Sequence, residues 1–197
     1  MRAAFLGNHM KNFVFSLMGV AMLAGVVVSG IPAFENADEQ AAPIYGIKIP
    51  AGYRDWTLIS VARIGGNIND MRAKLGNDMA IKAYREKKMP FPDGTIIARL
   101  AWRQVRSEEN NKDLRIDIEQ KVSPEEAEVL VADAFVAGPA TNVQFMVKDS
   151  KKYASTGGWG FAQFDDGKPA NEAVHKTCFP CHEPGKDRDF VFTRYAP

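Results

Sequence analysis

The fold class is indicated most clearly by TIIARLAWRQV, which occupies residues 95–105. β-branched and aromatic residues of this kind favour strands, because their side chains pack well on a pleated surface. Other segments share this composition and are bounded by Gly, Asp and Asn, as strands commonly are. They are residues 56–63, 143–148 and 159–164, with 71–75 as a further candidate. The chain is therefore predicted to be rich in strands.

Two segments between these strands have the features of helices. Residues 77–88 begin with a capping side chain, Asn77 or Asp78, and end in two lysines, where the helix dipole favours cations. The sequence SPEE at 123–126 is a capping box with proline at the first helical position, and we expect the Gly-Pro pair at 138–139 to end that helix. Because no regularly spaced crossover helices join the strands, we predict an α+β fold with a mainly antiparallel sheet and a few packed helices.

Length and composition exclude several classes of protein. The 197 residues are 46% hydrophobic and 25% charged, which is ordinary globular composition and excludes collagen-like, disordered and multi-span membrane chains. The net charge of +1 provides no basic surface for nucleic acid, so we expect no nucleic-acid partner. No internal repeat is present, and the length suits one compact domain.

The N-terminal residues have the features of a secretory signal peptide. Arg2 and Lys11 flank an apolar run at 13–28, small residues follow it, and no acidic residue occurs before Glu35. An uncleaved membrane anchor is the alternative, since the run is only slightly shorter than the ~20 residues needed to span a bilayer. We expect a periplasmic protein in either case. The expected organisation is a signal peptide at 1–33, a polar leader at 34–49 and one domain at 50–197.

The chemistry is indicated by Cys178-Phe179-Pro180-Cys181-His182, a C-x-x-C-H pentapeptide. This spacing lets two thiols form thioethers with the vinyl groups of a haem while the adjacent histidine reaches the iron. A thioredoxin-type dithiol would lie at a helix N-terminus after an early strand, and a structural zinc site would need a second Cys or His pair. A plain disulfide would leave His182 unexplained. We therefore predict one covalent haem c in a C-terminal attachment segment, held by Cys178 and Cys181, with His182 as axial iron ligand.

Spacing does not identify the sixth iron ligand. His175 lies shortly before His182, which favours a surface or proximal-side position over a distal one. Methionines more often fill a core than bind iron. A vacant position would bind gases or small nitrogen compounds, whereas a filled one would serve electron transfer. The candidates for a filled position are Met71, Met79, Met89, Met146 and His175.

Further motifs accompany this segment, and together they resemble the cytochrome P-460 family over about residues 50–197. They are YRDW at 53–56, FPDGT at 91–95, VKDSK at 147–151, GWGF at 158–161 and DFVFTR at 189–194. The resemblance implies a mainly antiparallel fold, often homodimeric, with one c-type haem on His182 and an open distal face. The family contains hydroxylamine-oxidising enzymes. Together with the export signal, this leads us to expect an exported cytochrome that binds or redox-converts nitric oxide or hydroxylamine, and an enzyme of this kind would release electrons to a partner cytochrome. The related cytochrome c′-beta proteins bind nitric oxide.

Two positions depart from the family's pattern. The resemblance implies a lysine cross-linked to the porphyrin where this chain has Arg99, and a distal glutamate where it has Gln144. A guanidinium stays protonated and is a poor nucleophile, whereas an amide can donate an N–H but cannot act as a base. We take both as distal candidates, with a propionate partner and a strand-surface residue as their alternatives. Lys87 and Lys88 are the candidates for a replacement cross-link. Enzymatic turnover therefore stays open, and the alternative function is periplasmic electron transfer with a protein sixth ligand.

Overall fold

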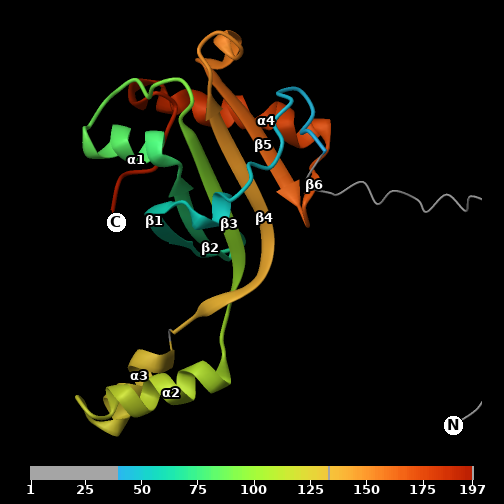
Figure 1. Cartoon of the computed structure of the whole chain (residues 1–197). Coiled ribbons are helices and arrows are strands. Elements are labelled where there is room, and N and C mark those ends of the chain that lie inside the picture. Colours follow the sequence, from blue (N-terminus) through green and yellow to red (C-terminus); the bar gives the residue numbers. More distant parts are fainter. Residues whose placement is uncertain (1–39, 133, 197) are drawn as a thin grey trace, which may run out of the picture. The chain divides into compact units, whose positions relative to one another are not determined.

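The computed structural model describes residues 40–132 and 134–196, and its centre is an antiparallel sheet (Figure 1). The six strands lie in the order β1-β2-β3-β4-β5-β6, so each strand pairs with the next one in the chain. They are β1 (Thr57–Ile64), β2 (Asp70–Gly76), β3 (Ile96–Val105), β4 (Val136–Lys148), β5 (Trp159–Asp165) and β6 (Lys168–Pro169). This meander confirms the predicted α+β class and the antiparallel sheet.

The described part of the chain contains four α-helices and three short 3-10 turns. The helices are α1 (Asp78–Arg85), α2 (Glu108–Ile118), α3 (Pro124–Ala132) and α4 (Glu172–His182). The turns are η2 (Tyr53–Asp55), η3 (Ala154–Thr156) and η4 (Glu183–Arg188). None of the helices within the described ranges has the length and apolar character that crossing a membrane would require.

The expected N-caps of α1 and α3 are present. The side chain of Asn77 accepts a hydrogen bond from Ala80 N at 3.0 Å, and Ser123 Oγ accepts one from Glu126 N at 3.2 Å. The expected end of the second helix was wrong, because α3 stops at Ala132 and residues 138–139 lie inside β4. The β3–β4 register is irregular there, and a bulge tolerates a proline that lacks an N–H.

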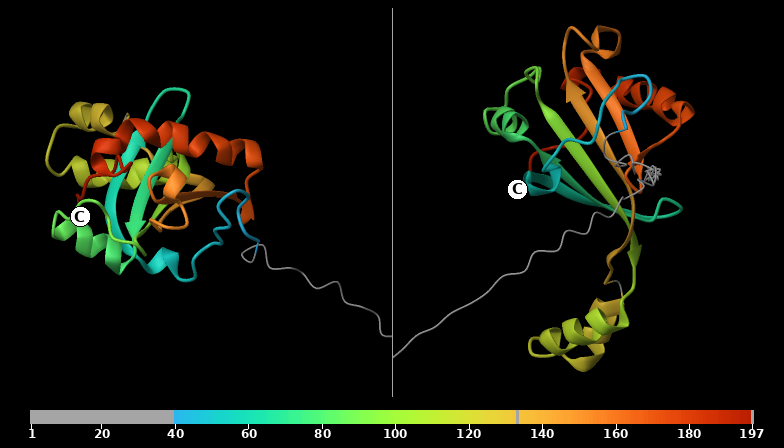
Figure 2. Two further views of the ribbon diagram at one scale, coloured as in Figure 1. Left: turned by 90° about the horizontal axis from the view of Figure 1, so that it is seen from above. Right: turned by 45° about the vertical axis from the view of Figure 1, so that its right-hand side comes forward.

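The two faces of the sheet differ in character because successive side chains of a strand alternate between faces. One face is apolar, and Phe145 packs there against the ring of Tyr53 with centroids 5.1 Å apart. Its buried strand residues are Ala98, Leu100, Val143, Phe145, Ala162 and Phe164. The other face carries Arg99 and Gln144 and is covered by α4, which lies against β5 (Figure 2).

The second half of the expected leader contributes to the core. Ala42, Tyr45 and Ile47 are buried, and Tyr153 donates its hydroxyl hydrogen to Tyr45 O at 3.1 Å. The expected signal peptide at 1–33 lies outside the described residues.

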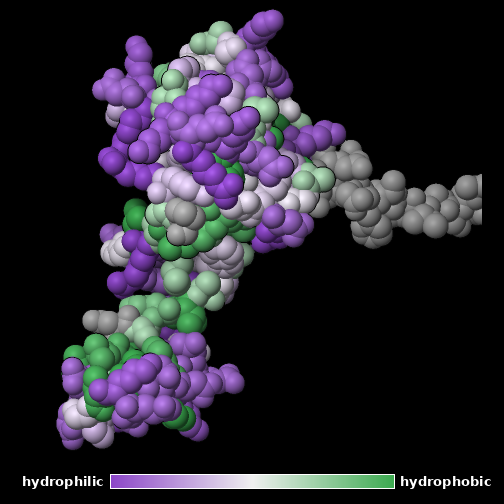
Figure 3. Space-filling view, turned by 60° about the vertical axis from the view of Figure 1, so that its left-hand side comes forward, coloured by the Kyte–Doolittle hydropathy of each residue, from purple (hydrophilic) through white to green (hydrophobic). Residues whose placement is uncertain are grey.

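Helices α2 and α3 form an insertion between β3 and β4. They pack against each other, and Arg115 of α2 forms ion pairs with Glu119 and with Glu128 of α3. Apolar side chains gather on the surface of this pair in Figure 3. The exposed large apolar residues there are Ile116, Val129 and Leu130. The insertion therefore adds apolar surface beyond the ends of the two longest strands.

Candidate functional site

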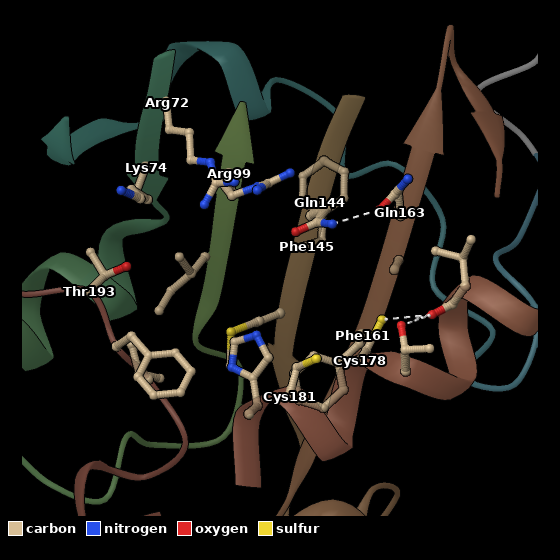
Figure 4. A pocket seen from close by; sticks show the side chains of 18 residues that line it. Arg72, Lys74, Arg99, Gln144, Phe145, Phe161, Gln163, Cys178, Cys181 and Thr193 are labelled. Atoms are coloured by element: carbon tan, nitrogen blue, oxygen red, sulfur yellow. Dashed lines mark hydrogen bonds between the residues drawn. The ribbon is translucent and has the colours of Figure 1, made fainter. Parts of the chain in front are cut away.

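A single cavity of about 380 Å³ is lined by all the residues that the sequence assigned to the site (Figure 4). Helix α4 contributes Cys178, Cys181 and His182 to its wall, and the sheet contributes Arg99 from β3 and Gln144 from β4. This volume is within the usual range of small-molecule pockets, roughly 300–1,000 Å³. The structure thus places residues that are far apart in the sequence around one space.

Helix α4 explains why the three C-terminal residues meet. The helix begins after Asn171, whose side chain accepts from Val174 N at 3.0 Å, and it ends at His182. Positions three and four apart share one helix face, so Cys178 lies on the same face as Cys181 and His182. Both cysteines are free thiols; Cys178 is half-buried and Cys181 is exposed.

The position of the cysteines on α4 argues against a redox dithiol. A thioredoxin-type pair uses a helix N-terminus to stabilise the thiolate, whereas these cysteines lie in the last turns of the helix. Burial, followed by the proximity of Cys181, raises the pKa of the Cys178 thiol above its ordinary value. Cys178 therefore stays protonated at neutral pH, which is the opposite of what rapid thiol exchange requires.

The imidazole of His182 is oriented as a metal ligand. Its Nδ1 lies 2.7 Å from Phe190 O, and because a carbonyl oxygen only accepts, Nδ1 carries the hydrogen and Nε2 keeps its lone pair. Burial lowers the pKa of His182, the hydrogen bond to Phe190 opposes this, and the charge of Arg99 lowers it further. The neutral ring is the form that binds a metal, with its other nitrogen fixed by a backbone acceptor.

Polar side chains form a row across four strands on the cavity side of the sheet. In the strand register Lys74 pairs with Arg99, Arg99 pairs with Gln144, and Gln144 pairs with Gln163. Gln144 Nε2 donates to Gln163 Oε1 at 2.6 Å, and Gln163 Nε2 donates to Asp165 Oδ1 at 3.0 Å. A carboxylate only accepts, so this chain fixes both amides. Gln144 therefore turns its carbonyl oxygen away from Gln163 (Figure 4).

Basic side chains gather at one end of this row. Arg72 donates to Asp70 Oδ2 from Nη2 at 2.9 Å, whereas Arg99 donates from Nη2 to the neutral amide of Asn142 at 2.6 Å. The Nε of Arg99 is buried and has no hydrogen-bond partner among the described residues. Burial first, and then the charge of Arg72, lowers the pKa of Arg99 to about 10. Burial and both arginines also lower the pKa of Lys74. The positive charge here is only partly compensated.

These residues fit a haem. The vinyl groups of a haem lie on the opposite edge of the porphyrin from its two propionates. The side chains that could bind these groups are separated in the same way in the cavity. Cys178 and Cys181 lie toward one end of the cavity and the basic side chains toward the other (Figure 4). The cysteines would hold the vinyl edge, Nε2 of His182 would bind the iron, and Arg99 with its basic neighbours would pair with the propionates.

Sequence reasoning missed several residues of the cavity, among them the charged Arg72 and Lys74 and the amide Gln163. The sequence contained a signal for Arg72 and Lys74, because residues two apart in the predicted strand at 71–75 share one face of the sheet. Lys74 lines the cavity and is thus a candidate for a cross-link to the porphyrin. Lys87 and Lys88, the earlier candidates for a cross-link, follow the end of α1 and do not line the cavity.

His175 is a core residue on α4, the helix that carries His182, so of the two expected positions, surface or proximal side, the surface one does not apply. Its side chain is fully buried, Gln163 N donates to its Nε2 at 3.1 Å, and its Nδ1 lies 2.9 Å from Asn171 O. Both ring nitrogens are therefore hydrogen-bonded to backbone atoms, so neither is available to bind iron.

The methionine candidates separate by position. Met79 and Met89 are exposed, and Met71 lies on β2 outside the lining of this cavity. Met146 lies on β4, pairs in register with Phe161, and lines the cavity. Among the described candidates for a sixth ligand, Met146 alone is placed near His182.

Comparison with known families places the cavity in context. A family model described as Cytochrome P460 matches residues 50–193, which include the whole sheet, α4 and every residue assigned to the site. A comparison with curated proteins found no match. The chain therefore belongs to the cytochrome P460 family, and the cofactor that this family implies is a haem.

Proposed function

We propose that this protein is an exported monohaem c-type cytochrome that binds or redox-converts a small nitrogen ligand, such as nitric oxide or hydroxylamine, at an open distal haem face. The observation that carries the proposal is the cavity itself, where two thiols and an imidazole with a free Nε2 lie opposite a polar strand row. The basic and apolar pattern of residues 1–33 supports export. Electron exchange would involve a redox partner protein.

A bound haem supplies an iron that binds small molecules and exchanges electrons. The thiols of Cys178 and Cys181 would hold the cofactor, and Nε2 of His182 would bind its iron. On the sheet side, the carbonyl oxygen of Gln144 is positioned to accept a hydrogen from an N–H or O–H of a ligand. The amide cannot remove a proton, so ligand binding and electron exchange suit this site better than rapid hydroxylamine turnover.

The position of Met146 supports one second function. A thioether that completed the coordination would make the protein an electron carrier. Met146 lines the same cavity as His182, so among the described methionines it is the one positioned to be a sixth ligand.

Carbon monoxide distinguishes the two functions. We expect the ferrous protein to be high-spin and pentacoordinate, and to bind carbon monoxide and nitric oxide readily, as shown by a shift of its Soret band. The Met146→Leu variant should give the same spectra. A low-spin ferrous protein that carbon monoxide does not change, but that becomes responsive in Met146→Leu, would instead establish the electron carrier.

The Gln144→Leu variant tests the role of the polar row. It should weaken hydroxylamine binding to the haem tenfold or less, because one hydrogen bond contributes on the order of 1 kcal/mol, and it should leave carbon monoxide affinity nearly unchanged. Optical titration with both ligands measures this. Thr193→Val, an isosteric change elsewhere in the cavity lining, is the control and should alter neither affinity. Equal losses for both ligands would contradict a specific contact of Gln144.

A further inference from the structure

Asp189 belongs to a buried ion pair, and it precedes Phe190, whose backbone carbonyl accepts the hydrogen of His182 Nδ1. Lys148, the last residue of β4, places its Nζ 2.6 Å from Asp189 Oδ1, and these side chains are only 6% and 9% exposed. Lys148 Nζ also donates to Gly157 O at 3.1 Å, and Asp189 Oδ2 accepts from Phe91 N at 2.8 Å. Both charges are therefore paired and further hydrogen-bonded, which is what buried charges require.

The backbone next to this pair is strained. Asp189 and Phe190 have φ angles of 52° and 64°, in the left-handed region that residues other than glycine seldom adopt. Such conformations persist only where surrounding contacts enforce them. Asp189 N donates to Lys186 O at 3.0 Å and Phe190 N to Gly185 O at 2.8 Å, while the ion pair holds the side chain of Asp189.

The Phe190 side chain is held from a second direction. A methyl group added at Gly157 would lie 2.1 Å from Phe190 Cε2, so the ring fits directly against this glycine. The ring of Phe179 packs against it with centroids 5.6 Å apart. The carbonyl of Phe190, which accepts the Nδ1 hydrogen of His182, therefore belongs to a segment that is fixed on both sides.

We propose that Lys148 and Asp189 are positioning residues for His182. Their ion pair holds Phe190 O where it accepts the Nδ1 hydrogen, and this hydrogen bond makes Nε2 a stronger donor to iron. A stronger donor favours the ferric state and lowers the reduction potential of the haem. The inference rests on the proposed function, in which His182 binds the haem iron. It also gives a role to VKDSK and DFVFTR, two motifs whose chemistry the sequence alone did not explain.

The test uses the haem-loaded Lys148→Met and Asp189→Asn variants. We expect the iron–histidine stretching band of the ferrous protein to move to lower frequency in both, by resonance Raman spectroscopy. The equilibrium constant for haem reduction should rise by up to about tenfold in both, and tenfold corresponds to about 59 mV for one electron. Direct charge effects would have opposite signs, because one variant loses a cation and the other an anion. Shifts of opposite sign would therefore overturn the proposal.

Two further variants separate positioning from general destabilisation. Gly157→Ala changes no charge but pushes on the Phe190 ring, so it should lower the stretching frequency as the ion-pair variants do. Ile81→Ala, at a buried position on α1, should lose thermal stability without changing the band or the potential. An unchanged band in Gly157→Ala, or an equal shift in Ile81→Ala, would contradict positioning. Absence of an iron–histidine band in the unmodified ferrous protein would instead contradict a pentacoordinate haem bound by His182, and so the proposed function on which this inference rests.

Discussion

A variant in which Cys178 and Cys181 are both replaced by alanine is expected to lose all covalently bound haem. These are the two cysteines of the chain, and thioether bonds to the vinyl groups need their sulfur atoms. Both lie on one face of the last turns of α4, where they can reach a single porphyrin edge. Acid–organic extraction of the denatured, reduced protein measures the effect: the haem stays with the unmodified chain and leaves the variant completely.

Neighbouring residues provide the controls for this experiment. Thr177→Ala changes the residue before Cys178 in the same cavity wall and should keep the haem attached. His182→Ala should also keep both thioethers, although the iron loses its protein ligand. Haem that resists extraction from the double variant would mean that another side chain forms the bond, and Lys74 would then be the first residue to test.

The His175→Ala variant is expected to lower the free energy of unfolding by about 2–4 kcal/mol. The change removes two hydrogen bonds, leaves Gln163 N–H without its acceptor, and opens a void at a position that is fully buried. An orphaned buried donor costs about 1–3 kcal/mol, and the void adds to that. Denaturant unfolding, followed by circular dichroism, measures the difference.

The adjacent Lys176 supplies a matched control for His175. Its ion pair with Glu172 is exposed, so Lys176→Met should change the stability by about 0.5 kcal/mol or less. The spin state of the haem should be the same in His175→Ala as in the unmodified protein. A change from low spin to high spin in His175→Ala would contradict the buried hydrogen-bonded position of this histidine.

Local signals account for the parts of the fold that the sequence predicted. β3 and β5 were expected almost at their observed bounds, because β-branched and aromatic residues dominate them. β4 begins before its predicted start, since Gly138-Pro139 has the composition of a break but fits an irregular stretch of the ladder. A side chain on Gly138 would come within 2.7 Å of Val105 Cγ1, so the position depends on a contact across strands.

Helix α4 was missed for a different reason. It is short, contains Pro180, and uses one face to line a cavity, so its apolar residues show no regular period. The cap formed by Asn171 was the available local signal.

The residues of the site also differ in whether a local sequence signal identifies them. Cys178, Cys181 and His182 form a local motif that is legible without any structure. Arg99 and Gln144 became candidates only through the family resemblance. Arg72, Lys74 and Gln163 join them through the pairing of strands, and a register of this kind depends on contacts between distant residues.

The sequential order of the strands also sets an order of assembly. Each strand can join a partner that precedes it in the chain, so the sheet grows from short-range contacts and has few long loops to close. Because the chain is synthesised from its N-terminus, β1 to β5 are available for folding before α4. The wall that carries Arg99 and Gln144 can therefore form while the thiols of Cys178 and Cys181 are still accessible. Docking of α4 then becomes the closing step of folding.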